Sequence, residues 1–295
     1  MQTISDIRRL LSDAGIRPRH RLGQNFLHDQ NQLLKLVTAS VARADTVDPA
    51  GKTCAFLEVG PGTGALTEAL LEHDQHDRSI VACEIDQDMV SILEDRLAGH
   101  DHRSRLSVLQ GDCLDSKHAL NARLMDLLDH RDFILAANLP YQAATPLMGT
   151  LLCRYWQPGC TPRCRGMYVT IQREVGQRLA AGPGTRDYGP LAVLAALLTN
   201  VRVLSKLSPH CFWPAPKVTS SILAIEPLDD DCLISLPVDP TALSTFLTSL
   251  FSKRRKQIGS ILGSDSTLPE GVTGQMRPEQ CTPAQLLEIA TRSGR

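Results

Sequence analysis

A stretch that combines an amide, a proline and an aromatic ring could hold and orient a flat, polar substrate. It begins at Asn138, directly after the hydrophobic run 133–137, and continues with Leu139, Pro140 and Tyr141. A strand that only had to turn would more often end in Gly, Asp or Ser. Because proline fixes φ and removes a backbone donor, the loop is stiff. Stiffness suits an amide and a ring that have to be aimed at a ligand.

Three closely spaced glycines, Gly60, Gly62 and Gly64, follow another hydrophobic run. Glycines let the backbone turn sharply and let a ligand approach it closely. A dinucleotide fingerprint places its third glycine three residues after the second, whereas here the distance is two. Glu58, just before the loop, also brings negative charge to the place where a pyrophosphate would bind. The pattern favours a ligand other than NAD, with a purely structural corner as the weaker alternative.

Two acidic residues, Glu84 and Asp112, end the next two hydrophobic runs. Glu84 lies 24 residues after Gly60, near the spacing at which an acid reaches ribose hydroxyls in nucleotide-binding α/β folds. Each acid alone is more typical of a helix cap or a solvated loop. The carboxyl ends of parallel strands meet at one edge of a sheet. Together with Asn138, these residues therefore predict a nucleoside pocket with a second substrate beside it.

Alternating strand and helix patterns have to position these residues. Strands are predicted at 55–59, 79–83, 106–110, 133–137 and 167–171, and helices at 65–71, 89–97 and 173–180. Such alternation predicts an α/β fold, a Rossmann-like parallel sheet with helices on both faces. Two further runs, 201–203 and 218–225, predict an antiparallel pair at the edge of the sheet.

The pattern becomes helical after Pro227. Helices are predicted at 241–262 and 284–291, and the second begins with a capping box, Thr282 to Gln285. Aspartates and prolines before residue 241 are typical of a linker. We therefore expect a ligand-binding domain over 1–230 and a small all-helical domain over 231–295.

The composition is that of a soluble globular protein. The 295 residues are 42% hydrophobic and 21% charged, with a net charge of −1. Nine scattered cysteines without a CxxC pair favour reduced thiols over disulfides or a metal site. The sequence shows neither a signal peptide nor the roughly 20 apolar residues of a membrane helix. These features predict a cytoplasmic protein without metal, and nothing suggests more than a monomer.

Eight blocks in order resemble the ribosomal small-subunit adenine dimethyltransferase family. They are RLGQNFLHD (21–29), LEVGPGTGALT (57–67), CEID (83–86), GDCL (111–114), NLPY (138–141), QREVGQRL (172–179), FWPAPKVTSS (212–221) and FSKRRKQI (251–258). NLPY alone would fit many N-methyltransferases. The family transfers methyl groups from S-adenosylmethionine to two adjacent adenines near the 3′ end of the rRNA. The resemblance therefore implies a class I methyltransferase fold and a small-ribosomal-subunit substrate, as naked RNA or an assembled subunit.

The resemblance also implies which residues hold the cofactor. Asn25 and Leu27 would close over S-adenosylmethionine, and Gly60 would pass its methionine part. Glu84 would hold the ribose hydroxyls and Asp112 the adenine amino group.

The chemistry then depends on the NLPY loop. Asn138 would sit between the cofactor and the target base. Its side-chain carbonyl and the backbone carbonyl of Leu139 would accept both N6 hydrogens, which turns the nitrogen lone pair toward the methyl group. Tyr141 would stack on the base, with Phe212 as the opposite wall, since stacking is worth about 1–3 kcal/mol per base. This scheme uses no metal and no dedicated general base.

Two basic clusters are the expected RNA contacts. They comprise Arg17, Arg19 and Arg21 with His20, and Lys253, Arg254, Arg255 and Lys256. A run such as KRRK is most often a solvated helix face. Two other functions stay open at this point: a large-subunit rRNA dimethyltransferase of the antibiotic-resistance type, and a non-catalytic ribosome-assembly factor.

Overall fold

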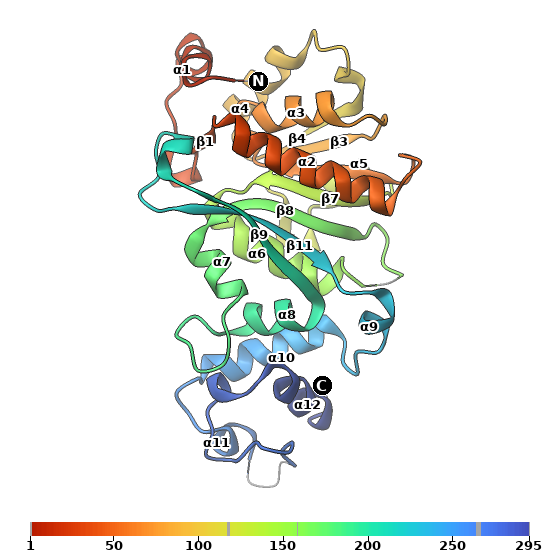
Figure 1. Cartoon of the computed structure of the whole chain (residues 1–295), viewed down its shortest axis with the longest axis vertical. Helices are drawn as coiled ribbons and strands as arrows, with labels where there is room; N and C mark the ends of the chain where they lie inside the picture. Colours follow the sequence, from red (N-terminus) through yellow and green to blue (C-terminus); the bar gives the residue numbers. More distant parts are fainter. Residues whose placement is uncertain (1, 117–118, 158, 264–266, 295) are drawn as a thin grey trace.

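The computed structural model describes residues 2–116, 119–157, 159–263 and 267–294, and this part of the chain contains a seven-stranded sheet (Figure 1). Its strands, in spatial order, are β4 (Leu106–Gln110), β3 (Ile80–Glu84), β2 (Cys54–Val59), β7 (Asp132–Asn138), β8 (Cys164–Gln172), β11 (Ser220–Pro227) and β9 (Thr199–Leu207). The first five are parallel, and β11 pairs antiparallel with both β8 and β9. The Rossmann-like sheet and the antiparallel edge pair are confirmed.

Helices cover both faces because the central strands are apolar on both sides. In β2, Phe56 packs in one buried cluster, and Ala55 and Leu57 pack in the other. The face of Phe56 is covered by α2 (Gln30–Val47), α3 (Ala65–His73) and α4 (Gln87–Leu97), and the opposite face by α5 (Ala122–Leu128), α6 (Tyr141–Arg154) and α7 (Arg173–Leu179). The remaining strands are short: β5 (Leu114–Ser116) pairs with β6 (Ala119–Leu120), and β1 (Phe26–Leu27) with β10 (Phe212–Trp213).

One predicted helix, 241–262, is wrong as a single element. The chain instead forms α10 (Pro240–Ser252) and α11 (Ile258–Leu262), joined by a turn. The six residues 252–257 are all polar, so no apolar side chain holds this part of a continuous helix on the core. The backbone N–H of Ile258 instead donates to Met276 O at 2.8 Å, which fixes the new direction.

The C-terminal helices extend the core. The helices α10 and α12 (Pro283–Arg292) pack with α8 (Pro190–Leu198) in the buried cluster that also lines the sheet, while α9 (Asp230–Ile234) leads into this region (Figure 1). The capping box from Thr282 to Gln285 is present at the start of α12. The domain division after residue 230 stays a prediction. No described helix is both long enough and apolar enough to span a membrane.

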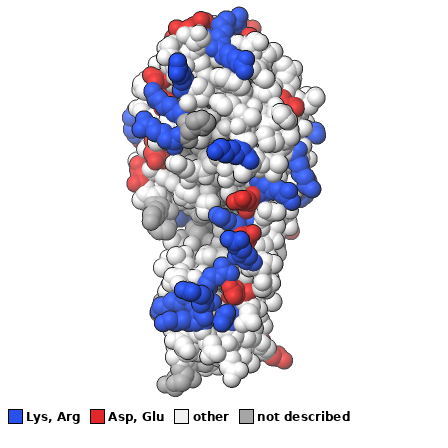
Figure 2. All heavy atoms as spheres, turned by 90° about the vertical axis from the view of Figure 1, so that its left-hand side faces the viewer, with Lys and Arg blue, Asp and Glu red and all other residues white. Residues whose placement is uncertain are grey.

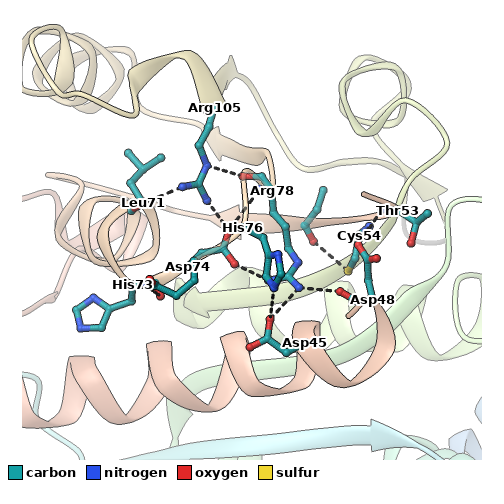
Figure 3. Close-up of polar contacts among 12 residues, drawn as sticks. Asp45, Asp48, Thr53, Cys54, Leu71, His73, Asp74, His76, Arg78 and Arg105 are labelled. Carbon is teal, nitrogen blue, oxygen red and sulfur yellow. Dashed lines mark hydrogen bonds and ion pairs between the residues drawn. The ribbon is translucent and has the colours of Figure 1, made fainter. Parts of the chain in front are cut away.

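A buried ion network closes the amino edge of the sheet (Figure 3). The Arg78 side chain has no exposed surface and lies 2.5 Å from Asp74 and 2.8 Å from Asp45. Arg105 contacts the second oxygen of Asp74 at 2.5 Å, and Arg78 also donates to the backbone oxygen of Asp48. The network therefore ties the ends of α2 and α3 to the segments that enter β3 and β4.

Candidate active site

The polar residues singled out at the strand ends lie at the carboxyl edge of the parallel strands. A first pocket is lined by Asn25, Leu27, Gly60, Glu84 and Asn138, among others. An adjoining pocket shares Gly60 and Glu84 and adds Asp112. The fold thus gathers all six predicted cofactor residues, Asn138 among them, around one cleft.

Close packing explains both the glycines and the proline. Gly60 and Gly62 have left-handed φ values of +74° and +55°. A Cβ on Gly60 would come within 2.8 Å of the Pro140 ring, and one on Gly62 within 2.9 Å of the Phe26 ring. The glycine loop is thus pressed between the NLPY loop and the N-terminal segment. Pro140 stiffens its own loop and also supports the neighbouring one.

Glu84 is the most constrained acid in the cleft. Its two carboxylate oxygens accept the backbone N–H groups of Gly62 at 3.2 Å and Asp86 at 3.0 Å. Only 6% of the residue is exposed, and burial raises the pKa of the carboxyl above its ordinary 4.5. These bonds fix the oxygens in place while leaving acceptor capacity for hydroxyl donors, so the residue fits a ribose.

Glu58 behaves differently from the expectation drawn from the sequence. Its side chain is buried and accepts the Thr67 hydroxyl at 2.7 Å. Burial raises the pKa of this carboxyl to about 8. The group is therefore largely protonated at neutral pH, and the negative charge invoked against a pyrophosphate is not present there.

The amide of Asn138 has a fixed orientation. Its Nδ2 donates to the backbone oxygen of Asn25 at 2.9 Å, and its side-chain carbonyl oxygen has no hydrogen-bond partner among the described residues. Leu139 is buried, and its backbone N–H donates to Thr170 O at 3.1 Å. The NLPY loop is thus tied to both the N-terminal segment and β8.

The two aromatic residues lie in different surroundings. Tyr141 is the first residue of α6 and partly buried, and its hydroxyl has no hydrogen-bond partner among the described residues. Phe212 is 3% exposed, pairs with Leu27 between β10 and β1, and does not line either pocket. The stacking roles of both rings stay predictions.

Sequence reasoning missed Ile85. This side chain follows Glu84, lines both pockets and is 50% exposed, which is unusual for a large apolar residue. The sequence does contain a signal, an apolar residue directly after an acid that ends a strand. The same pattern also fits a buried strand that continues by one residue.

The first basic cluster is not uniform. Arg17 and Arg21 are exposed, and neither has an ion-pair partner in the described part of the chain. Arg19, in contrast, lies 2.5 Å from both Asp86 and Asp88. Its charge is therefore compensated within the protein.

The second basic cluster lies in the turn between α10 and α11. Lys253, Arg255 and Lys256 are exposed, whereas Arg254 contacts Glu279 at 2.5 Å. Figure 2 shows lysine and arginine side chains over the upper part of one face and again over its lower, helical part. Basic side chains thus lie on this face over the upper part of the molecule and over the C-terminal helices.

Solved structures with the same architecture define the fold. A dimethyladenosine transferase from Plasmodium falciparum matches with a TM-score of 0.64 at 20% identity, covering 90% of this chain and 95% of that one. The 23S rRNA methyltransferase ErmE matches with a TM-score of 0.60 at 20% identity, covering 92% and 100%. At such identities the likeness shows the fold alone, which is that of a class I methyltransferase.

Sequence comparison is more specific. The family model described as ribosomal RNA adenine dimethylase matches residues 15–293. A ribosomal RNA small subunit methyltransferase A from Mycobacterium sp. (strain KMS) is 39% identical over 225 residues, 75% of this chain and 68% of the relative. A protein of the same name from Pseudomonas syringae pv. syringae (strain B728a) is 33% identical over 282 residues, 93% and 94% of the two chains. The chain belongs to the ribosomal RNA adenine dimethylase family, and its cofactor is S-adenosylmethionine.

Proposed function

We propose that this enzyme dimethylates N6 of two adjacent adenosines near the 3′ end of small-subunit rRNA. The observation that carries the proposal is the oriented amide of Asn138 beside the pocket that Gly60 and Glu84 line. The names of the relatives at 33% identity and above support the small subunit over the large one. The intact NLPY loop and strand-end acids argue against a factor that has lost catalysis.

The family pattern suggests a role for each cofactor residue, and its position in the cleft supports that role. Glu84 accepts the ribose hydroxyls, and Asp112, in the adjoining pocket, accepts the adenine amino group. Ile85 packs its exposed side chain on a face of the adenine. Gly60 lets the methionine part pass close to the backbone.

The N-terminal segment covers the other side. Asn25 and Leu27 line the first pocket from this segment, opposite the strand-end acids. We assign them the role of closing over the cofactor.

The reaction requires the target amine to be held rather than deprotonated beforehand. S-adenosylmethionine supplies an electrophilic methyl group. In the first transfer the Asn138 side-chain oxygen and the Leu139 backbone oxygen would accept the two N6 hydrogens, and in the second one of them would accept the single remaining hydrogen, which localises the nitrogen lone pair and stabilises the developing positive charge. In each transfer the N6–carbon bond would form as the carbon–sulfur bond breaks, the neutral thioether would leave, and N6 would then lose one proton to water. Tyr141 stacks on the extruded base. The opposite wall assigned to Phe212 stays a prediction, because that residue is only 3% exposed.

The pH dependence of cofactor binding tests the role of Glu84. Protonation turns one carboxylate oxygen into a donor, so affinity should fall on acidification. Because burial raises the pKa above 4.5, the fall should begin at a higher pH than an exposed glutamate would give. Glu84→Gln should weaken binding near neutral pH by roughly 10–100-fold and abolish this dependence, since bonds to charged groups are worth about 1.5–3 kcal/mol.

Calorimetric titration with S-adenosylmethionine across the acidic range would measure this effect. Glu72→Gln, an exposed glutamate in α3, is the matched control and should bind as the wild type does. A Glu84→Gln variant with wild-type affinity at every pH would contradict the assignment.

The RNA contacts give a second expected result. Arg17, Arg21, Lys253, Arg255 and Lys256 are proposed to contact phosphates, and Arg254 to support the turn through Glu279. Removing Lys253, Arg255 and Lys256 together by alanine substitution should reduce the slope of log affinity against log salt by about 2, at roughly 0.7–0.9 per contact. Filter binding at several salt concentrations would measure it, with the exposed Lys35→Ala as control. An unchanged slope would show that these three residues do not contact RNA phosphates and that the RNA binds another surface.

A methylation assay with both ribosomal subunits tests which subunit the enzyme modifies. Labelled S-adenosylmethionine is incubated with small subunits that lack the modification, or with large subunits. Label in the small subunit is expected, and label only in the large subunit would favour the resistance-type function. We propose that the enzyme acts as a monomer in the cytoplasm, on small-subunit RNA that is naked or already assembled.

A further inference from the structure

Asp86 is held by two side chains from the N-terminal segment. Its carboxylate, 1% exposed, lies 2.5 Å from Arg19 Nη1 and accepts Gln24 Nε2 at 2.8 Å. The other terminal nitrogen of Arg19 lies 2.5 Å from Asp88. One arginine thus spans two carboxylates at the start of α4. Charge-assisted hydrogen bonds are roughly twice as strong as neutral ones, so the two contacts hold Arg19 firmly against α4.

Only Ile85 separates Asp86 from Glu84, the proposed ribose-binding residue. The backbone N–H of Asp86 donates to Glu84 Oε1 at 3.0 Å. Gln24 lines the first pocket itself, directly before Asn25. Arg19 and Gln24 therefore control two things at once: the loop that orients Glu84 and the wall that carries Asn25.

A second contact fastens the same segment to the glycine loop. Gln2 is buried, its Nε2 donates to Thr63 O at 2.7 Å, and its Oε1 accepts the Thr63 hydroxyl at 2.7 Å. Thr63 lines the first pocket. Between the two contacts, the apolar face of α1 (Ile4–Asp13) packs Ile7 and Leu11 in a buried cluster with Phe26.

We propose that Arg19 and Gln24, acting through Asp86, and Gln2, acting through Thr63, are positioning residues for the binding of S-adenosylmethionine. The segment 2–27 then forms one side of the cofactor pocket. It binds the glycine loop at Thr63 and the loop after Glu84 at Asp86. Arg19 belongs to this wall and not to the RNA-contacting surface that its neighbours Arg17 and Arg21 predict. The inference rests on the proposed function, because it takes Glu84 as the ribose ligand.

Prearranged walls raise affinity because the protein loses less freedom when the ligand binds. Arg19→Ala and Asp86→Asn should each raise the dissociation constant for S-adenosylmethionine by about tenfold, which equals about 1.4 kcal/mol. The double variant should be little worse than either single one, because both remove the same contact. Arg19→Lys should restore part of the affinity. In turnover, KM for the cofactor should rise while kcat changes little.

The matched control is Arg17→Ala, two residues away and exposed. The two arginines should give opposite profiles when cofactor affinity is measured by calorimetry and RNA affinity by filter binding at several salt concentrations. Arg17→Ala should leave cofactor affinity unchanged and lower the salt slope of RNA binding by about 1. Arg19→Ala should weaken cofactor binding and leave that slope unchanged. The reverse profile for Arg19→Ala would overturn the proposal.

Two further variants separate the possible failures. Gln24→Ala removes two hydrogen bonds of a partly exposed residue, one donated to Asp86 and one accepted from the backbone N–H of Arg19, and tests the contact with Asp86 if Arg19→Ala does not fold. Gln2→Ala tests the contact with Thr63 in the same titration. If Glu84→Gln weakens cofactor binding while the Arg19, Gln24 and Gln2 variants bind normally, only the positioning role fails. If Glu84→Gln itself binds as wild type, the proposed cofactor site fails.

Discussion

Asn138→Ala should lower the turnover of methyl transfer by about 10²–10³-fold, the usual loss when one preorganised group is removed from a reacting centre. The substituted side chain no longer offers an oxygen to N6, so the amine keeps its lone pair in the ring. Cofactor affinity should change less, because Glu84 and Asp112 are untouched and only the hydrogen bond from Asn138 to the backbone oxygen of Asn25 is lost. The effect therefore belongs to kcat and not to KM for the cofactor.

Two further variants test whether this loss is specific to the side-chain oxygen of Asn138. Asn138→Asp keeps an acceptor oxygen and should retain more activity than the alanine variant. Asn200→Ala removes an exposed asparagine from β9 and should be as active as wild type. Single-turnover rates with saturating cofactor would measure all three. Near-normal turnover of Asn138→Ala would show that the amide does not contact the reacting nitrogen.

Arg78→Met should cost about 3–5 kcal/mol of folding stability, the usual penalty for removing one partner of a buried ion pair. The side chain has no exposed surface, and its loss leaves Asp74, also without exposed surface, with Arg105 alone. Asp45 and the carbonyl of Asp48 lose this donor as well and keep only His76 and the backbone N–H of Gly51 as partners among the described residues. At this chain length the melting temperature should fall by roughly 10 °C.

Denaturant unfolding would measure the loss as a lower midpoint with an unchanged slope. Arg9→Met removes an arginine that is 70% exposed and pairs with Asp6 at 3.1 Å, and should cost no more than about 1 kcal/mol. Equal stabilities of the two variants would mean that the buried network contributes no more than a surface pair. Since the network lies at the edge opposite the cleft, the folded Arg78→Met protein should still bind the cofactor.

Local patterns predicted the parts of the site that local chemistry determines. Hydrophobic runs marked the strands, and their last residues marked the edge where Gly60, Glu84 and Asn138 meet. That inference succeeds because parallel strands bring their carboxyl ends together whatever packs around them.

The remaining features depend on contacts between distant segments. The arginine at position 19 looks like its neighbours in sequence, and only the approach of α4 shows that Asp86 and Asp88 compensate its charge. The raised pKa of Glu58 follows from burial, which no spacing in the sequence reveals. The break after Ser252 has no glycine or proline to mark it and arises from pairing with the loop at Met276.

The most direct test of the central claim is the identity and place of the product. Small ribosomal subunits that lack the modification are incubated with the enzyme and S-adenosylmethionine, and the 3′-terminal RNA fragment is analysed by mass spectrometry. The account predicts four added methyl groups, as two adjacent N6,N6-dimethyladenosines, and none with Asn138→Ala. An unmodified 3′ fragment after incubation with a wild-type protein that binds the cofactor would contradict it.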